Sequence, residues 1–391
     1  MATTHDLLSR LDHKDEVDVG VLDFSKAFDI VPHKRLMRKL RLYGVEGKTS
    51  RWISEFLLGR TQSVLVDGVR SHTRSRTDGD PVMSGVPQGT VMGPLLFLLY
   101  INDLPSVLNP STSCCLFADD CLIYRSIHSM EDKVILQKDL DSLFEWGQVW
   151  GLKFNVSKCN ILHLARQTQK PVRFYTLGGE IIGSVPEAKY LGVTLSNNYG
   201  ARSSQWRPHI LDTVSRANQR LGFLRRNLRG SPYRLRETAY FTIVRSSLEY
   251  CGAIWDPSVK EEIDSLEIVQ RRAARWARGA RGVISVTDLL RDLGWQSLAD
   301  RRRNQRLCLF YKLLHGGLDL PPESVGIRLH QGRATRGSHQ WKIVRPSAGD
   351  RQSPLWKSTV LRTIPEWNSL NPGTVNADSI TTFKSRLSAN P

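Results

Sequence analysis

Two adjacent aspartates, Asp119 and Asp120, interrupt an otherwise apolar stretch and constrain the fold of this chain more than any other feature. The stretch reads Cys-Cys-Leu-Phe-Ala before the pair and Cys-Leu-Ile-Tyr after it. Two short apolar segments around a tight polar turn predict a β-hairpin with the aspartates at its tip. Neighbouring carboxylates repel each other and lose hydration between buried strands. A divalent cation would remove that cost, so the pair indicates either a metal site or a plain acidic turn.

A third carboxylate, Asp23, follows the apolar segment Val19–Leu22, which predicts a short buried strand. Adjacent antiparallel strands would bring Asp23 to the tip of the hairpin. Carboxylate oxygens are suitable ligands for Mg²⁺, and two such ions roughly 3.5–4 Å apart can clamp the attacking and leaving oxygens of a phosphoryl transfer. From the residues alone, a plain strand end remains the alternative for Asp23.

The charge balance indicates a polyanionic partner. Lys and Arg number 55 against 38 Asp and Glu, a formal net charge of +17. Such an excess is typical of nucleic-acid binding, with an anionic membrane surface as the weaker alternative. No apolar run reaches the roughly 18–20 residues of a membrane span, and the first residues do not resemble a signal peptide. We therefore expect an intracellular protein, in the nucleus or the cytoplasm, that is not secreted and does not bind membranes.

Six cysteines are scattered along the chain without CxxC pairs or Cys/His clusters. This spacing predicts neither a zinc module nor a disulfide framework, but reduced thiols within a core.

Strand and helix patterns alternate as far as about residue 200, which predicts an α+β fold around one antiparallel sheet. Beyond that point the sequence is helical and rich in arginine. Ser258 and Glu261 have the spacing of a capping box at the start of one of these helices. We expect three parts: residues 1–200, a basic helical region 201–317, and a region 318–391 whose Pro, Gly and Ser content leaves its order open.

Several segments resemble, in order and spacing, the palm motifs of reverse transcriptases, in particular those of non-LTR (LINE-type, jockey-like) retrotransposons. Three successive palm motifs correspond to Leu22–Asp29, Ser84–Leu95 and Phe117–Asp120, and the next two to Asn155–Lys158 and Lys189–Val193. Segments Ser247–Trp255, Leu266–Arg272 and Arg362–Asn368 resemble the C-terminal region of such elements. The resemblance implies a right-hand polymerase palm, an antiparallel sheet with packed helices, followed by an all-helical thumb.

The resemblance also implies catalytic roles. Asp23, Asp119 and Asp120 would be catalytic and would bind two Mg²⁺ ions, with Mn²⁺ as an alternative, and the Phe24 carbonyl would be a further metal ligand. Lys158 would protonate the leaving pyrophosphate, a general-acid role. A solvated surface lysine is the alternative for Lys158.

Substrate contacts are implied as well. The ring of Phe28 would exclude a 2′-hydroxyl and so favour deoxynucleotides, unless it is a core aromatic. Gln88 and Gly89 would lie under the nascent base pair, unless they are only a turn before a helix. The residues of the implied primer grip, which could also be a core hairpin, are Tyr190, Leu191 and Gly192.

The function implied is that of an RNA-directed DNA polymerase, a nucleotidyltransferase that binds an RNA template, a DNA primer and dNTPs. Only about twenty residues precede Asp23, so we expect the fingers and the endonuclease of a complete element to be missing. The alternative is therefore a catalytically inactive retroelement relic that binds nucleic acid. An RNA-dependent RNA polymerase has a similar palm, but Phe28 and the Phe117-Ala118 pair argue against it. The sequence leaves the template, the host role and the oligomeric state open.

Overall fold

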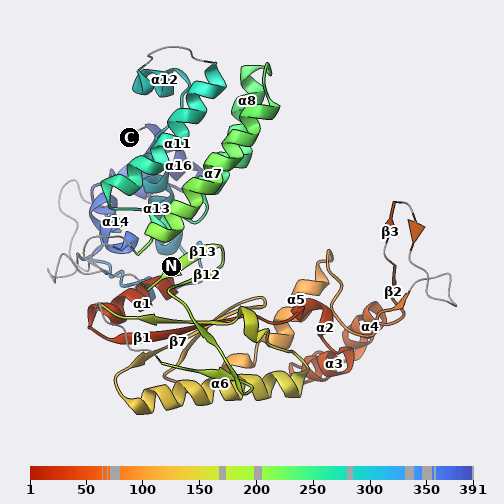
Figure 1. Ribbon diagram of the computed structural model, residues 1–391. Helices are drawn as coiled ribbons and strands as arrows, with labels where there is room; N and C mark the ends of the chain where they lie inside the picture. Colours follow the sequence, from red (N-terminus) through yellow and green to blue (C-terminus); the bar gives the residue numbers. More distant parts are fainter. Residues whose placement is uncertain are drawn as a thin grey trace. The chain divides into compact units, whose positions relative to one another are not determined.

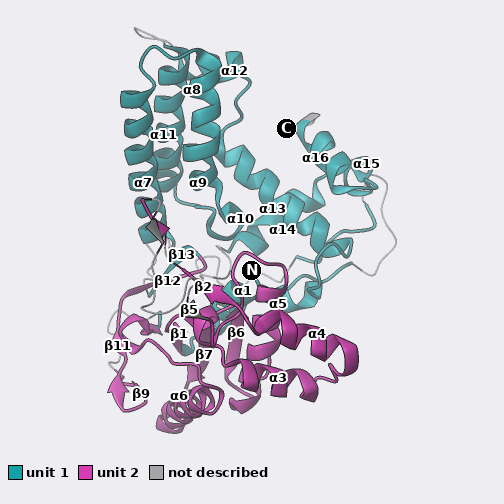
Figure 2. Cartoon of the chain, turned by 90° about the vertical axis from the view of Figure 1, so that its right-hand side faces the viewer, with its two compact units in different colours: residues 1–16, 164–169, 192–391 teal, residues 17–163, 170–191 magenta. Residues whose placement is uncertain are grey.

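The structure, a computed structural model, describes residues 1–63, 65–67, 69–70, 80–166, 173–197, 205–279, 285–330, 339–345, 355 and 358–389. The chain divides into two compact units, coloured separately in Figure 2. The sheet unit comprises residues 17–163 and 170–191. The helical unit comprises residues 1–16, 164–169 and 192–391. The division expected from sequence, at residues 200 and 317, stays a prediction.

A five-stranded sheet organises the sheet unit and confirms the α+β fold class (Figure 1). Its strands, in spatial order, are β11 (Gly183–Ser184), β8 (Asn160–Leu164), β1 (Glu16–Leu22), β7 (Asp120–Ile127) and β6 (Ser113–Phe117). The hairpin β6–β7 is antiparallel, as expected. The edge strand β11 instead runs parallel to β8, because the long connection through residues 165–182 lets the chain return in the same direction.

Shorter elements complete the sheet unit. Its helices are α2 (Ala27–Ile30), α3 (His33–Leu42), α4 (Gly47–Leu57), α5 (Met92–Ile101), η1 (Leu104–Val107), α6 (Met130–Trp150) and η2 (Val156–Lys158). Two-stranded sheets pair β2 (Thr61–Gln62) with β5 (Asp80–Pro81), β3 (Leu65–Val66) with β4 (Val69–Arg70), and β9 (Thr176–Leu177) with β10 (Glu180–Ile181). Strand β12 (Glu187–Tyr190) ends this unit, and it pairs with β13 (Val193–Ser196), which is counted with the helical unit.

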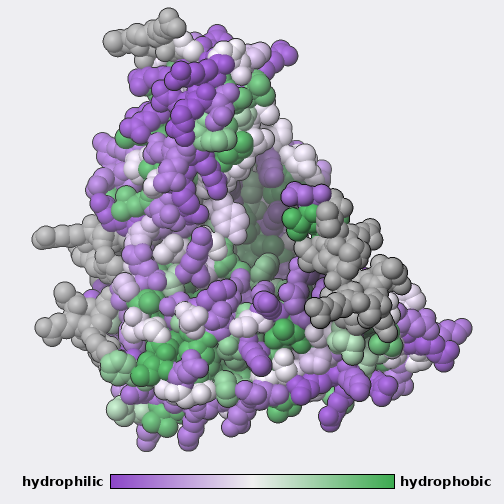
Figure 3. Space-filling model, turned by 45° about the vertical axis from the view of Figure 1, so that its right-hand side comes forward, coloured by the Kyte–Doolittle hydropathy of each residue, from purple (hydrophilic) through white to green (hydrophobic). Residues whose placement is uncertain are grey.

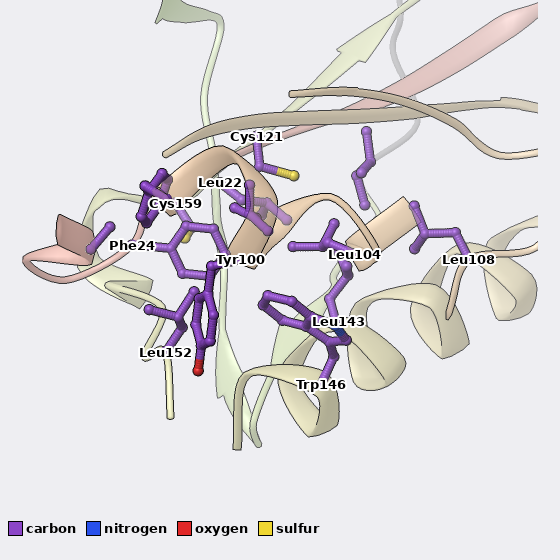
Figure 4. Packing of buried hydrophobic residues seen from close by; sticks show 14 of the residues in the cluster. Leu22, Phe24, Tyr100, Leu104, Leu108, Cys121, Leu143, Trp146, Leu152 and Cys159 are labelled. Atoms are coloured by element: carbon purple, nitrogen blue, oxygen red, sulfur yellow. The ribbon is translucent and has the colours of Figure 1, made fainter. Parts of the chain in front are cut away.

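Helix α6 covers one face of this sheet (Figure 1). A capping box fixes its start, because the Ser129 side chain accepts from the Asp132 amide while the Asp132 carboxylate accepts from the Ser129 amide. The apolar positions of α6 are buried as its spacing predicts: Leu136, Leu140, Leu143 and Trp146. They pack into a core with Leu22, Phe24 and Tyr100 (Figure 4). This core supports the strand ends that carry Asp23 and Asp120.

Lys39 is buried in that core, although lysine rarely is. Its ammonium donates to the Tyr100 carbonyl at 2.6 Å and pairs with Asp103. It also lies over the ring of Trp150, 3.9 Å from the centroid. Burial lowers the pKa of Lys39, against the opposing effect of the bond to Asp103. The lysine therefore links α3, α5 and α6 through one charge.

The helical unit is built on long helices that lie side by side. Its elements are α1 (Ala2–Asp12), α7 (Arg207–Asn227), α8 (Tyr233–Ala239), the π-helix η3 (Tyr240–Arg245), α9 (Ser246–Glu249), α10 (Gly252–Trp255), α11 (Lys260–Arg278), α12 (Val286–Asp292), α13 (Leu298–Leu314), η4 (Pro322–Val325), α14 (Thr359–Asn368), α15 (Pro372–Val375) and α16 (Ile380–Ala389). The expected capping box at Ser258 and Glu261 is wrong: α11 is preceded by Val259 and has no side-chain cap. One residue of offset moves Ser258 out of the capping position. None of the helices in the described ranges combines the length and apolarity needed to cross a membrane.

Residues beyond 318, whose order the sequence left open, contribute to a second core. Trp367 and Phe383 are fully buried there against Phe310 of α13. Met1 and Ala2, next to α1, pack against the same cluster. The far ends of the described chain therefore share one core.

A buried ion cluster joins α10, α13 and α14. Asp256 is 7% exposed and pairs with three arginines. Its Oδ1 lies 2.7 Å from Nε of Arg302, and its Oδ2 lies 3.0 Å from Nε of Arg306 and 3.2 Å from a terminal nitrogen of Arg362. Arg306 also pairs with Glu366 at 3.0 Å. Both terminal nitrogens of Arg302 are buried without a hydrogen-bond partner. The positive charge of Arg302 is therefore neutralised mainly by Asp256, through its Nε.

Candidate active site

The acidic hairpin has the geometry that the sequence predicts. Phe117 pairs with Asp120, which leaves Ala118 and Asp119 as a two-residue turn. Of these two, only Ala118 has a positive φ, at 51°, the pattern of a type II′ turn. Alanine adopts this region at a cost of about 1–2 kcal/mol. The turn presents Asp119 at the tip and Asp120 as the first residue of β7.

Backbone hydrogen bonds position Asp23 at the end of β1. Its amide donates to Sγ of Cys159 at 3.5 Å, and its carbonyl accepts from the amide of Asn155 at 2.8 Å. On β1, Gly20 faces Ile123 of β7. Gly20 precedes Asp23 by three residues, and Ile123 follows Asp120 by three. Because β1 and β7 are neighbours in the sheet, Asp23, just after β1, and Asp120, at the start of β7, lie near enough for the charge of Asp23 to raise the pKa of Asp120.

The three carboxylates interact electrostatically. Burial raises the pKa of Asp120, and the negative charges of Asp119 and Asp23 raise it further. Oδ2 of Asp23 is buried without a hydrogen bond, although Nζ of Lys158 lies 3.5 Å away. Lys158 is itself 67% exposed, on η2. The structure therefore brings Asp23, Asp119, Asp120 and Lys158 together.

The carboxylate oxygens of Asp23, Asp119 and Asp120 are the type of ligand that a hard divalent cation prefers. An orphaned carboxylate oxygen and mutual repulsion at Asp120 are the conditions that a cation would relieve. In the part of the chain that the structure describes, however, no three His, Cys, Asp or Glu side chains are grouped closely enough to hold a metal ion as they stand. The Phe24 carbonyl lies beside Asp23, where Phe24 pairs with Phe154.

The glycine-bracketed loop before α5 folds against the segment after Asp23. The side-chain amide of Gln88 donates to Oδ1 of Asp29 at 2.8 Å, and the Val86 amide donates to the Phe28 carbonyl at 2.8 Å. Gln88 and Gly89 are exposed, and Gly89 has a φ of 77°. The loop packs closely on α5, because a Cβ at Gly93 would lie 2.2 Å from the Pro87 carbonyl oxygen.

Phe28 packs partly into the core rather than standing free. Its ring stacks on Phe97 of α5, with centroids 4.3 Å apart. Phe97 is fully buried, whereas Phe28 keeps part of its surface exposed. The ring is therefore held in one orientation, which suits both a core aromatic and a steric gate.

The Tyr190–Gly192 segment forms a tight turn. Leu191 and Gly192 both have positive φ, 47° and 78°, as in a type I′ turn. The Tyr190 hydroxyl donates to the Cys115 carbonyl of β6 at 3.4 Å. Burial raises the pKa of Tyr190, and the nearby charge of Asp120 adds to the effect. Tyr190 therefore lies close to the acidic hairpin.

Two residues of this site were not identified from the sequence. Asp29 fixes Gln88, and Cys159 holds the backbone of Asp23. Asp29 is the second acid of the Leu22–Asp29 motif, so its position was a usable signal. Nothing in the sequence distinguishes Cys159 from the other thiols.

Comparison with known proteins agrees with this geometry. Residues 3–195 match the family described as reverse transcriptase (RNA-dependent DNA polymerase). Residues 3–195 belong to the reverse transcriptase family. The resemblance noted from the motifs is thereby confirmed, and so is the polymerase palm as the fold of this part.

Relatives of this reverse transcriptase domain come from insect mobile elements. The RNA-directed DNA polymerase from mobile element jockey of Drosophila funebris is 27% identical over 82% of this chain and 34% of its own length. The probable RNA-directed DNA polymerase from transposon BS of Drosophila melanogaster is 29% identical over 76% of this chain and 33% of its own length. The chain thus spans about a third of these relatives. Among solved structures, a Candida tropicalis telomerase matches with a TM-score of 0.35 and 12% identity, over 78% of this chain and 49% of that chain.

Proposed function

We propose that this chain is an RNA-directed DNA polymerase that extends a DNA primer on an RNA template with dNTPs. The observation that carries the proposal is the meeting of Asp23 with the Asp119–Asp120 hairpin, where burial and the charges of Asp119 and Asp23 raise the pKa of Asp120. Two Mg²⁺ ions, or Mn²⁺ instead, would be held by the three carboxylates and the Phe24 carbonyl. When bound, they would supply charge stabilisation for the attacking and leaving oxygens.

The protein's own residues would divide the remaining work. Nζ of Lys158 lies 3.5 Å from Oδ2 of Asp23, and Lys158 would deliver a proton to the leaving pyrophosphate. Phe28, held against Phe97, would close the space beside the sugar. Gln88, oriented by Asp29, would support the nascent base pair together with Gly89.

The Tyr190–Gly192 turn would hold the primer strand near the hairpin. The proximity of Tyr190 to Asp120 supports this role. The expected intracellular location is supported by the free state of all six cysteines.

A second candidate is a relic that binds nucleic acid without turnover. It is favoured by one observation: the described carboxylates are not grouped closely enough to hold a metal ion as they stand. The excess of basic residues is compatible with both candidates.

Primer extension separates the two candidates. The purified chain receives poly(rA)/oligo(dT), dTTP and Mg²⁺, beside the double variant Asp119→Asn/Asp120→Asn. We expect incorporation by the wild type and background by the variant. Equal background incorporation by both would refute the polymerase, and binding without extension would establish the relic.

Two further variants test the individual roles. Lys158→Gln should lower the single-turnover rate by roughly 10²–10⁴-fold, while Lys153→Gln, an exposed lysine nearby, should leave it unchanged. Phe28→Ala should increase incorporation of ribonucleotides relative to deoxynucleotides. An unchanged ratio would remove Phe28 from the site.

A further inference from the structure

A cavity of about 490 Å³ opens at one end of the helical unit. It is lined by four arginines, a tryptophan and small neighbours: Arg225, Arg226, Arg229, Arg236, Trp276, Gly222, Leu228 and Gly230. These residues come from the end of α7 and the turn that follows it, from the last turn of α11 and from α8, and α11 packs against both other helices. In Figure 3 hydrophilic side chains gather over these upper helices.

The arginines of this pocket lack acidic partners. Among the described residues, no carboxylate forms an ion pair with Arg225, Arg226, Arg229 or Arg236. Nε of Arg236 is buried without a hydrogen bond, and one of its terminal nitrogens donates to the Trp276 carbonyl at 3.2 Å.

Glu237, which follows Arg236 in sequence, is already engaged elsewhere. Glu237 accepts from the Tyr233 hydroxyl at 2.6 Å and from the Trp295 indole at 2.8 Å. The positive charge of the pocket is therefore not compensated by this neighbour.

Helix dipoles explain only part of this arrangement. Basic residues in the last turn of a helix gain about 0.3–1 kcal/mol each, and Arg225 and Arg226 occupy that place in α7. The dipole does not require four arginines to surround a cavity, or an indole to line it.

The chemistry of the walls identifies the ligand. Guanidinium groups match phosphate oxygens bidentately, and an indole face accepts a stacked base. The cavity has the size of a small-molecule site, enough for one nucleotide unit. A base inside a duplex keeps both faces stacked, whereas a single strand leaves a face free for Trp276.

We propose that this pocket binds a single-stranded nucleic acid, with phosphates on the arginines and one base on Trp276. Five exposed arginines on α8 and α11 continue the basic track beside it: Arg234, Arg271, Arg272, Arg275 and Arg278. The inference goes beyond the proposed polymerase and does not depend on it, because none of these residues belongs to the carboxylate site.

Fluorescence anisotropy with labelled oligouridylate, in EDTA and over a series of NaCl concentrations, tests the stacking. Trp276→Ala should weaken binding roughly 5- to 150-fold, and Trp276→Phe should retain most of the affinity. Binding of a duplex should be the same for all three proteins. Wild-type affinity in Trp276→Ala would overturn the proposal, as would equal losses on duplex and single strand.

The salt dependence tests the phosphate contacts. Arg226→Gln/Arg229→Gln should reduce the slope of log affinity against log salt by about 1.4, since each contact to a single strand contributes about 0.7. The control Arg207→Gln/Arg216→Gln removes the same charge from α7, the helix that carries Arg226, but from arginines already paired with Glu261 and Asp212. Equal slopes in the two double variants would refute the pocket.

Two competitors and one variant complete the design. Oligothymidylate should compete with oligouridylate if the pocket reads phosphate and base alone, and uridine monophosphate should compete weakly because it lacks the flanking phosphates. Full competition by the mononucleotide at equal concentration would overturn the proposal, because it would mean that the pocket binds a free nucleotide rather than a strand. Asp119→Asn/Asp120→Asn should bind as the wild type does, so failed primer extension with intact binding would refute only the polymerase.

Discussion

Asp256 is the carboxylate that all three arginines of the buried cluster in the helical unit share. Asp256→Asn keeps the shape of the side chain and removes its charge. Among the described residues, Glu366, which is 32% exposed, would still pair with Arg306, and the charge of Glu267 would still act on Arg302. Removing one partner of a buried ion pair costs about 3–5 kcal/mol, because the other charge stays buried. Since Arg302 and Arg306 are 1% and 3% exposed, we expect the upper half of that range.

The cluster also predicts that removing one of its arginines costs less stability than removing the charge of Asp256. Arg302→Met keeps the apolar stem and removes two buried nitrogens that have no hydrogen-bond partner. Asp256 would still have two arginine partners, so we expect a loss below about 2 kcal/mol. Asp212→Asn breaks an exposed pair with Arg216 and should cost only about 0.3–0.5 kcal/mol.

Hydrogen exchange of the peptides that cover α13 and α14 measures these differences without assuming one cooperative transition for the whole chain. Asp256→Asn should lower protection about 10³-fold, because each 1.36 kcal/mol is a factor of ten. A loss under tenfold, or an equal loss in Arg302→Met, would refute the view that one carboxylate compensates the cluster.

Three further outcomes concern the sheet unit, one of them with a control glycine in α7 of the helical unit. Because the pKa of Lys39 is lowered in the folded protein, the unfolded chain binds the lysine proton more tightly. The free energy of unfolding should therefore rise as the pH approaches the usual lysine value of 10.5. In urea unfolding, the variant Lys39→Met should not show this rise. Gly93→Ala should destabilise the protein by about 1–3 kcal/mol in thermal unfolding, because the new Cβ would clash with the Pro87 carbonyl oxygen. Gly222→Ala is the control, since its Cβ would meet a flexible side chain at 3.5 Å. This control should stabilise the protein by about 0.5–1 kcal/mol. Because the pKa of Asp120 is raised, stability in EDTA should fall as pH rises from 3.8 through the raised value, and Asp120→Asn should abolish that fall.

The acidic hairpin was predictable because its signals are local. Alternating apolar segments and a two-residue polar turn define β6 and β7 within fifteen residues, and the apolar spacing of α6 does the same for a helix. The motif spacing then placed Asp23 beside the hairpin. A hydrogen bond such as that of Gln88 to Asp29 joins residues far apart in sequence, and its partner was not foreseen.

The partners that neutralise the buried charges could not be predicted from the sequence. Lys39 looks like one basic residue of an amphipathic helix, and its partner Asp103 lies 64 positions away. Asp256 and Arg362 are 106 positions apart, so no local pattern marks them. At the start of α11 a local pattern was present but misleading. Ser258 and Glu261 have the spacing of a capping box, yet the helix begins one residue later, after Val259.

The core shared by α1 and the helices beyond residue 307 has a consequence for synthesis. Leu7, Leu8 and Leu11 are buried, and α1 packs on η4. Helix α1 leaves the ribosome long before its partner η4 (Pro322–Val325), so this contact cannot form until the intervening chain has been made. Residues 17–191 contain their own core and can fold earlier. The segment Ala2–Asp12 is thus made before residues 17–191, but its contact with η4 can form only after they have been made.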